Sequence, residues 1–193
     1  MIDENNGKRE HILNIAAELF NRYGYKKTSM EQIARAARVG KASIYQLFND
    51  KALLLGEVYQ LKAQKLREKM IDSYDATETV VTRLLKMLAI AREYCSNDPL
   101  FCQFLELREL EELKTLPQFS AIESGAVKLI KELLDEGVAR GEIRSMPSEM
   151  AARILFRIGF YLSHHGADLF ELYPPAEILG LFDTVLQKGL SIV

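Results

Sequence analysis

Lys41, Gln46 and Lys51 lie within eleven residues of one another and carry side chains suited to binding a nucleic acid duplex. The first two are long enough to reach base edges in a major groove, where lysine prefers the acceptors of guanine and glutamine pairs with adenine. Lys51 brings a charge that can bind a phosphate. Residues 21–51 contain seven Lys/Arg against two acidic residues, although the whole chain has a net charge of −2. This basic segment on an otherwise acidic chain indicates a polyanionic partner.

Four helices are predicted to position these side chains. The spacing of apolar residues places them at about residues 8–23, 29–37, 41–48 and 51–74. Thr28 followed by Glu31 fits a capping box at the start of the second helix. A turn at Val39-Gly40 separates the second helix from the third, because glycine tolerates the backbone that ends a helix. Two short helices with a tight turn, supported by a longer one, form a helix-turn-helix; a purely structural three-helix bundle is the alternative.

The order of residues in this segment resembles the TetR family of bacterial transcriptional regulators. The resemblance covers about 45 residues and lies in Ile12-Leu13-Asn14-Ile15-Ala16-Ala17-Glu18-Leu19-Phe20, Tyr23-Gly24-Tyr25, Thr28-Ser29-Met30, Ile33-Ala34 and Ala37-Arg38-Val39-Gly40-Lys41-Ala42-Ser43-Ile44-Tyr45-Gln46-Leu47-Phe48-Asn49-Asp50-Lys51. Two places depart from the family pattern. Arg38-Val39-Gly40 stands where many members have a Gly-Val-Ser type of turn, and Leu47 stands where an aromatic residue or a histidine is frequent. Both lie close to the reading helix, so the operator sequence does not follow from the resemblance.

The resemblance implies which side chains meet the DNA. Thr28 and Tyr45 are expected to bond phosphates, and the short side chains Ala42 and Ser43 lie at the groove, where an alanine can touch a thymine methyl. Lys51 is expected to hold a further phosphate at the positive end of the fourth helix. The complete predicted contact set is Thr28, Lys41, Ala42, Ser43, Tyr45, Gln46 and Lys51.

The rest of the chain is predicted to be helical as well, which makes the fold all-α. Further helices are expected at about residues 80–94, 100–113, 117–139, 148–169 and 175–190. No useful strand alternation occurs. We therefore expect two parts: residues 1–51 as an N-terminal three-helix helix-turn-helix DNA-binding domain, and residues 52–193 as a C-terminal helical bundle for effector binding and dimerisation.

Dimerisation is implied by the resemblance, because the last two long helices of family members form a four-helix interface. On the first of these helices the predicted interface residues are Leu155, Gly159, Leu162, Ser163 and Gly166; on the last they are Ile178, Leu181, Phe182 and Val185. A purely internal core could use the same residues. A homodimer would place two reading helices about 34 Å apart, which matches a palindromic operator.

A small effector is also implied, since family members usually hold an inducer among the middle helices. Apolar and adaptable candidates suit a hydrophobic effector: Met87, Tyr94, Phe101, Phe104, Phe119, Phe156 and Phe160. Each of these could equally be ordinary core. Arg153 and Arg157 could meet an anionic ligand head, or form a salt-bridged face with Glu106 and Glu109. The expected function is a ligand-responsive regulator: a repressor that the effector releases from its operator, as is common in the family, with an activator as the alternative.

Other classes of protein are disfavoured by the sequence. It has no HExxH, GxGxxG or P-loop motif, so we expect no enzyme, no cofactor and no metal site; the adjacent His164 and His165 point to different helix faces. Two cysteines, a polar N-terminus and the lack of a long apolar run predict a cytoplasmic protein without a membrane partner. The remaining alternative is a helical protein-binding adaptor whose DNA-binding head is vestigial.

Overall fold

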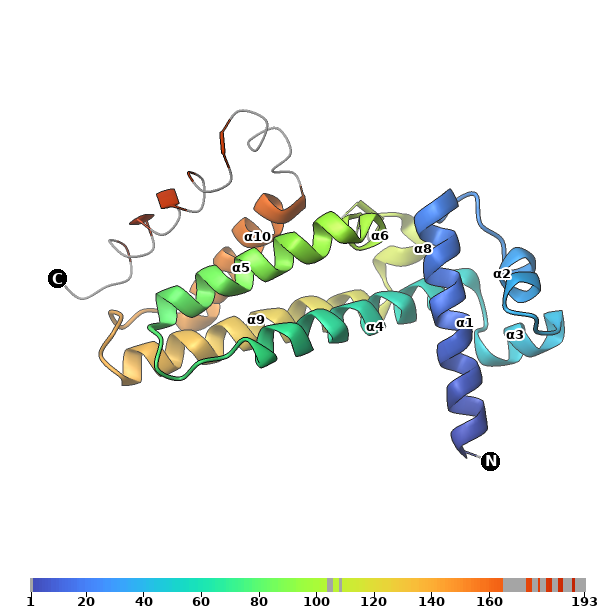
Figure 1. Ribbon diagram of the computed structural model, residues 1–193, viewed down its shortest axis with the longest axis horizontal. Coiled ribbons are helices and arrows are strands. Elements are labelled where there is room, and N and C mark those ends of the chain that lie inside the picture. Colours follow the sequence, from blue (N-terminus) through green and yellow to red (C-terminus); the bar gives the residue numbers. More distant parts are fainter. Residues whose placement is uncertain are drawn as a thin grey trace. The chain divides into compact units, whose positions relative to one another are not determined.

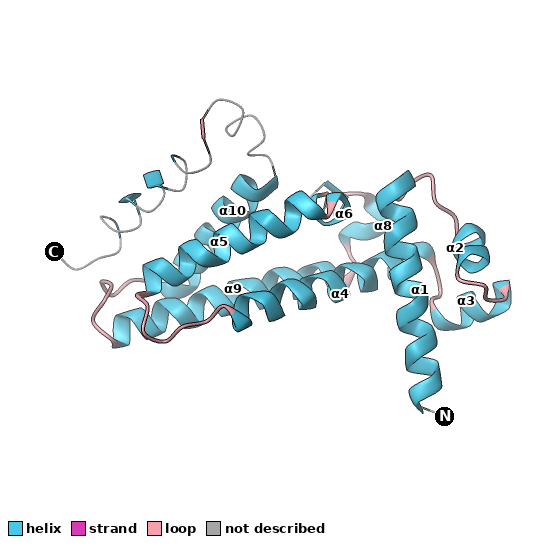
Figure 2. Cartoon of the chain, viewed as in Figure 1, coloured by secondary structure: helices cyan, strands magenta, loops and turns pink. Residues whose placement is uncertain are grey.

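The computed structural model describes residues 2–103, 106–107 and 109–164, and beyond them residues 173–174, 177, 180–181, 184–185 and 189. Every regular element in these residues is a helix, and no strand occurs among them (Figure 2). In chain order the helices are α1 Ile2–Tyr23, α2 Met30–Ala36, α3 Lys41–Leu47, α4 Lys51–Asp72, α5 Val80–Asn97, α6 Pro99–Cys102, α8 Glu111–Lys114, α9 Pro117–Ala139 and α10 Ser148–His164 (Figure 1). The predicted all-α fold is confirmed. No helix in the described ranges is both long and apolar enough to cross a membrane.

The chain forms two compact units. The first unit comprises residues 1–64 and 98–122, and the second unit comprises residues 65–97 and 123–193. Consequently α4 and α9 each contribute residues to both. The predicted boundary after residue 51 separates parts by function, and it stays a prediction.

The first unit packs α1, α2, α3 and the start of α4 around a core of large apolar side chains. Phe20 and Tyr25 lie with their ring centroids 5.7 Å apart, and Ile33, Ile44 and Phe48 are almost completely buried. Further along α4, Tyr59 is buried between the rings of Phe101 and Phe119. Its hydroxyl donates to the carbonyl of Leu100. Asn21 of α1 accepts a hydrogen bond from the Leu100 N–H at 2.7 Å. These contacts connect α1 and α4 to α6.

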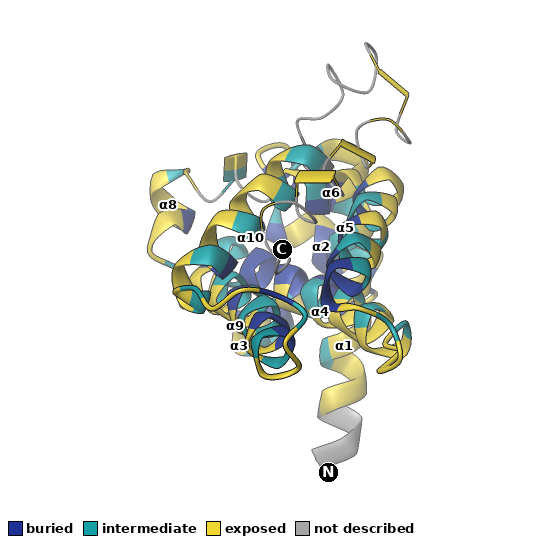
Figure 3. Ribbon diagram, turned by 90° about the vertical axis from the view of Figure 1, so that its left-hand side faces the viewer, coloured by how far each residue is buried: buried dark blue, intermediate teal, exposed yellow. Residues whose placement is uncertain are grey.

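The second unit has its own apolar core between α5, α9 and α10. Its buried members include Val80, Leu84, Leu134 and Ile143. Gly137 lets α9 approach this core, because a Cβ at that position would lie 2.9 Å from a Val80 methyl. Figure 3 shows that the long helices bury one side and expose the other. Such one-sided burial is the outcome that an amphipathic pattern predicts.

Two local predictions are wrong. The capping box of α2 consists of Ser29 and Gln32: the Gln32 N–H donates to the Ser29 hydroxyl at 3.2 Å, and the Ser29 N–H donates to the Gln32 side chain at 2.7 Å. Thr28 is one residue too early. The single helix expected at residues 100–113 is interrupted: in its described part α6 ends at Cys102, residues 109–110 are not helical, and α8 begins at Glu111. Asp98 caps α6 with a hydrogen bond from the Phe101 N–H at 3.1 Å, as a proline-led helix start favours.

Candidate nucleic-acid interface

Helix α3, the predicted reading helix, buries its apolar side and exposes its polar side. Ile44 and Phe48 are buried in the first unit, so the helix cannot rotate without exposing them. The exposed residues of α3 are Lys41, Ala42, Tyr45 and Gln46, while Ser43 is half-buried. Their spacing places the four exposed residues on one face. The structure therefore brings the predicted base-reading side chains together.

Lys41 is held by an exposed ion pair within the first unit. Its Nζ lies 2.8 Å from a Glu31 carboxylate oxygen of α2, and 68% and 46% of the two side chains are exposed. The hydrogen bond between them raises the pKa of Lys41 and lowers the pKa of Glu31. Such exposed pairs are weak in water, because the solvent screens both charges. Lys41 can therefore exchange this partner for another anion at little cost.

Thr28 lies differently from the expectation. Its side chain is buried, and its hydroxyl donates to the Gly24 carbonyl at 2.8 Å. The hydroxyl thus closes the turn between α1 and α2. This internal bond argues against the phosphate contact that the family resemblance implied for Thr28.

Lys51 begins α4 and is linked to the turn after α1. Its Nζ donates to the Tyr25 carbonyl at 2.9 Å and lies 4.2 Å from the centroid of the Tyr25 ring. Burial is the main cause that raises the pKa of the Tyr25 hydroxyl, and the nearby carboxylate of Glu112 raises it further. The hydroxyl therefore stays protonated. An ammonium group has three donors. The bond to Tyr25 orients Lys51 and leaves donors for a phosphate.

Arg9 is a residue that the sequence did not single out. Its Nη1 donates to the Leu47 carbonyl at the end of α3 at 3.0 Å, and its Nε donates to a Glu57 carboxylate oxygen of α4 at 3.0 Å. The guanidinium carbon also lies 4.5 Å from the centroid of the Phe48 ring. Arg9 thus joins α1, the end of α3 and α4. No local signal marks it, because its partners are 38 and 48 residues away along the chain.

The turn between α2 and α3 has an unusual residue at its centre. Arg38 has a φ of 57°, in the left-handed region. Its N–H donates to the Arg35 carbonyl at 3.2 Å, and the Val39 N–H donates to the Ala34 carbonyl at 2.9 Å. This pair of bonds is a Schellman motif, whose left-handed residue is usually glycine.

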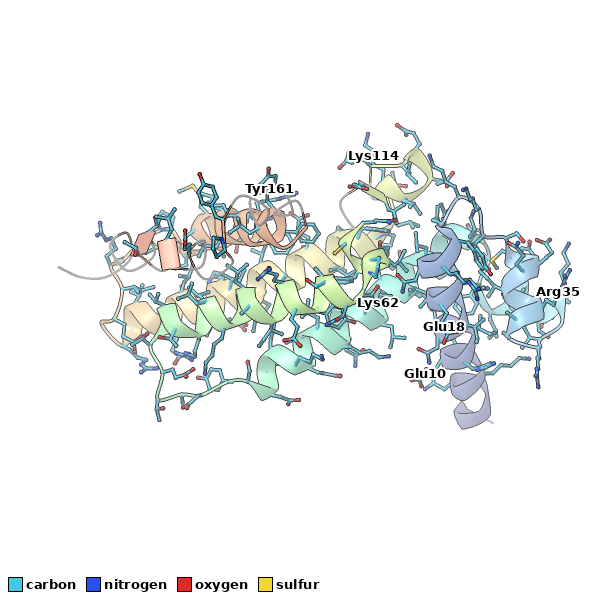
Figure 4. All side chains as sticks on the ribbon, turned by 45° about the horizontal axis from the view of Figure 1, so that its top comes forward. Glu10, Glu18, Arg35, Lys62, Lys114 and Tyr161 are labelled. Atoms are coloured by element: carbon cyan, nitrogen blue, oxygen red, sulfur yellow. The ribbon has the colours of Figure 1, made fainter. Side chains whose placement is uncertain are left out.

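The exposed apolar face of α10 is another candidate binding surface. Met150, Ile154, Ile158 and Tyr161 are between 41% and 58% exposed. Their spacing of four, four and three residues forms one stripe along the helix, and Figure 4 shows Tyr161 projecting outward from α10. An apolar stripe of this length on a helix indicates a partner surface. We call these four residues the α10 stripe.

The α10 stripe differs from the predicted dimer face. Leu155 packs on the core of the second unit, and a Cβ at Gly159 would lie 3.5 Å from Leu88 of α5. Leu162 is half-buried. Leu155 and Gly159 therefore contact the inside of the second unit, and the dimer face expected on α10 stays a prediction. Leu181 and Val185 are exposed, whereas Gly166, Ile178, Phe182 and the side chain of Ser163 lie outside the described residues.

The second unit also contains a cavity of about 220 Å³ between the end of α4, α5 and α9. Its apolar wall is formed by Met70, Ile71, Met87, Leu129 and Leu133. Arg83 lies at its polar side, 3% exposed, and donates to both carboxylate oxygens of Glu136 at 2.8 and 3.0 Å. Lys86, Glu132 and Glu136 line the cavity as well, so it combines an apolar wall with charged side chains of both signs. An apolar wall with a few polar groups is the usual composition of a small-molecule site.

The predicted effector residues do not all meet at this cavity. Met87 lines it, whereas Phe101 and Phe119 pack on Tyr59 in the first unit. In the second unit, the rings of Phe156 and Phe160 are 5.8 Å apart, and Lys69 lies 5.8 Å from the Tyr94 ring. Phe104 lies outside the described residues. Arg153 and Arg157 pair with Glu149 and Glu123, each at 2.7 Å, and not with the partners expected for them.

The comparisons with known proteins agree on a family and a fold. The sequence model for "Bacterial regulatory proteins, tetR family" matches residues 12–58. The HTH-type transcriptional regulator YhgD of Bacillus subtilis is 24% identical over 188 residues, covering 95% of this chain and 97% of its own length. The HTH-type transcriptional repressor KstR2 of Rhodococcus jostii is 25% identical over 194 residues, covering 97% and 89%.

A solved structure shows the same fold. The transcriptional regulator FadR from Bacillus subtilis, in complex with stearoyl-CoA, superposes with a TM-score of 0.77 at 21% identity and covers 93% of this chain and 98% of its own. At this identity the likeness establishes the arrangement of helices. Roles of single residues must come from the geometry described above.

Proposed function

Because the chain belongs to the TetR family of bacterial regulatory proteins, we propose that it is a ligand-responsive repressor that binds a palindromic DNA operator as a homodimer. The exposed face of α3 carries this proposal. Lys41, Tyr45 and Gln46 project together from a helix whose opposite side is buried in the first unit. A helix presented in this way fits a major groove about 12 Å wide, and long polar side chains reach its floor.

The proposal assigns DNA contacts to six residues, namely Lys41, Ala42, Ser43, Tyr45, Gln46 and Lys51. Lys41 and Gln46 would read base edges, and Tyr45 and Lys51 would hold phosphates on either side of the groove. Thr28 is left out because its buried hydroxyl is bonded to Gly24. A bacterial regulator that binds DNA would act in the cytoplasm.

Dimerisation is proposed through the α10 stripe. Its exposed apolar side chains would be covered by the same helix of a second copy, together with the segment that carries Leu181 and Val185. In functional terms, residues 1–51 would bind DNA, and residues 52–193 would bind the effector and dimerise. A two-fold dimer would offer two copies of α3 to the two halves of a palindrome.

The effector is proposed to be a small hydrophobic molecule. The cavity between α4, α5 and α9 supports this, since Met70 and Met87 form an adaptable apolar wall. The structural relative FadR was solved in complex with stearoyl-CoA, which carries a long hydrophobic chain. Effector binding would release the operator only if the ligand prefers the state that does not bind DNA.

Selection of duplexes from random DNA by ligand-stripped protein tests the proposal directly. Binding of the selected duplex is then measured by fluorescence anisotropy at about 150 mM salt with excess random competitor, because purely electrostatic binding is weak there. We expect a palindromic sequence and saturation at two protomers per duplex. Failure to enrich any sequence would contradict the DNA-binding proposal and favour the adaptor alternative.

A further inference from the structure

The turn that leads into α3 contains a residue whose backbone conformation is unfavourable. Arg38 adopts a φ of 57°, where the Cβ of an L-residue is crowded by the backbone. The Schellman bonds from the Arg38 and Val39 N–H groups require this conformation whichever residue is present. Glycine would adopt it without strain. The arginine therefore carries a cost that the fold of the turn does not require.

The chain places its glycine in this turn at a position that does not need one. Gly40 has a φ of −65°, which any residue adopts, and a Cβ there would meet only the Ser43 hydroxyl oxygen at an ordinary 3.8 Å. Glycine is thus absent at the strained position and present two residues later. Local rules of this kind are most often broken where a residue serves function.

No contact within the described structure explains Arg38. Its side chain is exposed and has no hydrogen bond, ion pair or ring contact with any described residue. Two other cations of the first unit are engaged: Lys41 with Glu31, and Lys51 with Tyr25. Arg38 keeps its whole guanidinium group available, three residues before the first residue of α3.

We propose that Arg38 binds a DNA phosphate beside the groove that α3 enters, and so adds a contact that the turn of a glycine-containing sequence lacks. The inference rests on the proposed DNA binding. A phosphate fits better than a base because Arg38 belongs to the turn and not to the exposed face of α3. The planar guanidinium donates two parallel hydrogen bonds to phosphate oxygens, a geometry that lysine cannot reproduce.

The test uses the duplex selected by wild-type protein and three variants of Arg38. R38G and R38N remove the charge and both tolerate the left-handed conformation, whereas R38K keeps the charge. We expect R38G and R38N to bind about 10-fold more weakly than wild type at about 150 mM salt, equally on selected and mismatched duplexes. The slope of log affinity against log salt should fall by about 1 for each arginine removed, and R38K should keep most of it.

Controls separate a lost contact from a damaged fold. The Tm of R38G should not fall below that of wild type, because glycine relieves the strain at this position. K128Q, which removes a positive charge from an exposed position of α9, should bind DNA as wild type does. If wild type selects a duplex and R38G and R38N bind it with unchanged affinity and salt slope, the Arg38 proposal is overturned while the proposed function stands. If wild type selects nothing, it is the proposed function that fails.

Discussion

The exposed faces of α3 and α10 show what one helical architecture can offer to two kinds of partner. Both helices bury an apolar side, with Ile44 on α3 and Ala152 on α10 completely inaccessible. On the open side α3 carries Lys41 and Gln46, whereas α10 carries the apolar residues of the α10 stripe. A polar open face suits a hydrated polyanion, and an apolar one suits another apolar protein surface. In both helices the buried side determines how the helix packs, and the exposed side determines which kind of partner it suits.

The largest effect is expected when a charge is introduced into the exposed apolar face of α10. Ile154→Asp places a charge in the middle of the α10 stripe, on a side chain that is exposed in one protomer. A two-fold interface carries the change twice and would have to bury both charges, so we expect the dimer dissociation constant to rise about 100-fold or more. Sedimentation velocity over a dilution series measures this directly.

The matched control for Ile154→Asp is Ser124→Asp, which adds the same charge at an exposed position of α9. It should sediment as wild type does. Because Ile154 is exposed, the far-UV circular dichroism of Ile154→Asp should also match wild type. An Ile154→Asp protein that remains a dimer at every dilution would show that the α10 stripe is not the interface.

The two helices also differ in how far the sequence predicts them. On α3 the apolar residues occupy one side and the polar residues the other, so the period alone identifies the exposed residues. On α10 both sides are apolar: Leu155 packs inward and Ile154 is exposed. The spacing of apolar residues predicts which positions are buried, but not whether they are buried within one protomer or against a second one. For this reason the sequence predicts the helix but does not identify which of its apolar sides is exposed in one protomer.

Interactions between distant residues limit the prediction of the site in a similar way. The start of α2 was predicted to within one residue from cap composition, although the cap is Ser29 and not Thr28. The role of Arg9 depends on Leu47 and Glu57, which reach it only once α1, α3 and α4 have packed. The strain at Arg38 is likewise visible only in the backbone, although the arginine in a glycine position was already a departure from the family pattern.

An intermediate effect should appear when the polar open face is altered at one side chain. Gln46→Ala removes the amide proposed to read a base, which is worth about 1–3 kcal/mol of discrimination. We expect preference at one or two base pairs of the operator to fall about 10-fold, measured by anisotropy on singly substituted duplexes. Tyr45→Phe, the control, removes only a proposed phosphate donor and should weaken binding to every duplex alike. A Gln46→Ala protein with unchanged preference at every position would remove Gln46 from the reading set.

The smallest effect concerns two ion pairs, Arg83 with Glu136 and Lys41 with Glu31. Arg83 is buried, whereas both side chains of the second pair are exposed. Hydrogen bonding to Arg83 lowers the pKa of Glu136 below its ordinary value of 4.5, and hydrogen bonding to Lys41 lowers the pKa of Glu31. A carboxylate with a lowered pKa stabilises the fold fully above its unfolded value, and this contribution is lost as the pH falls through the folded value. Arg83 is buried and would be left without its counter-charge, whereas Lys41 is exposed and hydrated.

We therefore expect Glu136→Gln to unfold at lower urea than wild type at pH 7, and the difference to shrink as the pH falls below about 4.5 and through the lowered pKa of Glu136, where the wild-type side chain itself becomes neutral. Glu31→Gln is the control and should follow wild type closely over the whole range. The urea midpoint at each pH, followed by circular dichroism, is the measurement. A Glu136→Gln difference that stays constant with pH would mean that the side chain supports the second unit by its shape and not by its charge, and the contrast between the two ion pairs would then disappear.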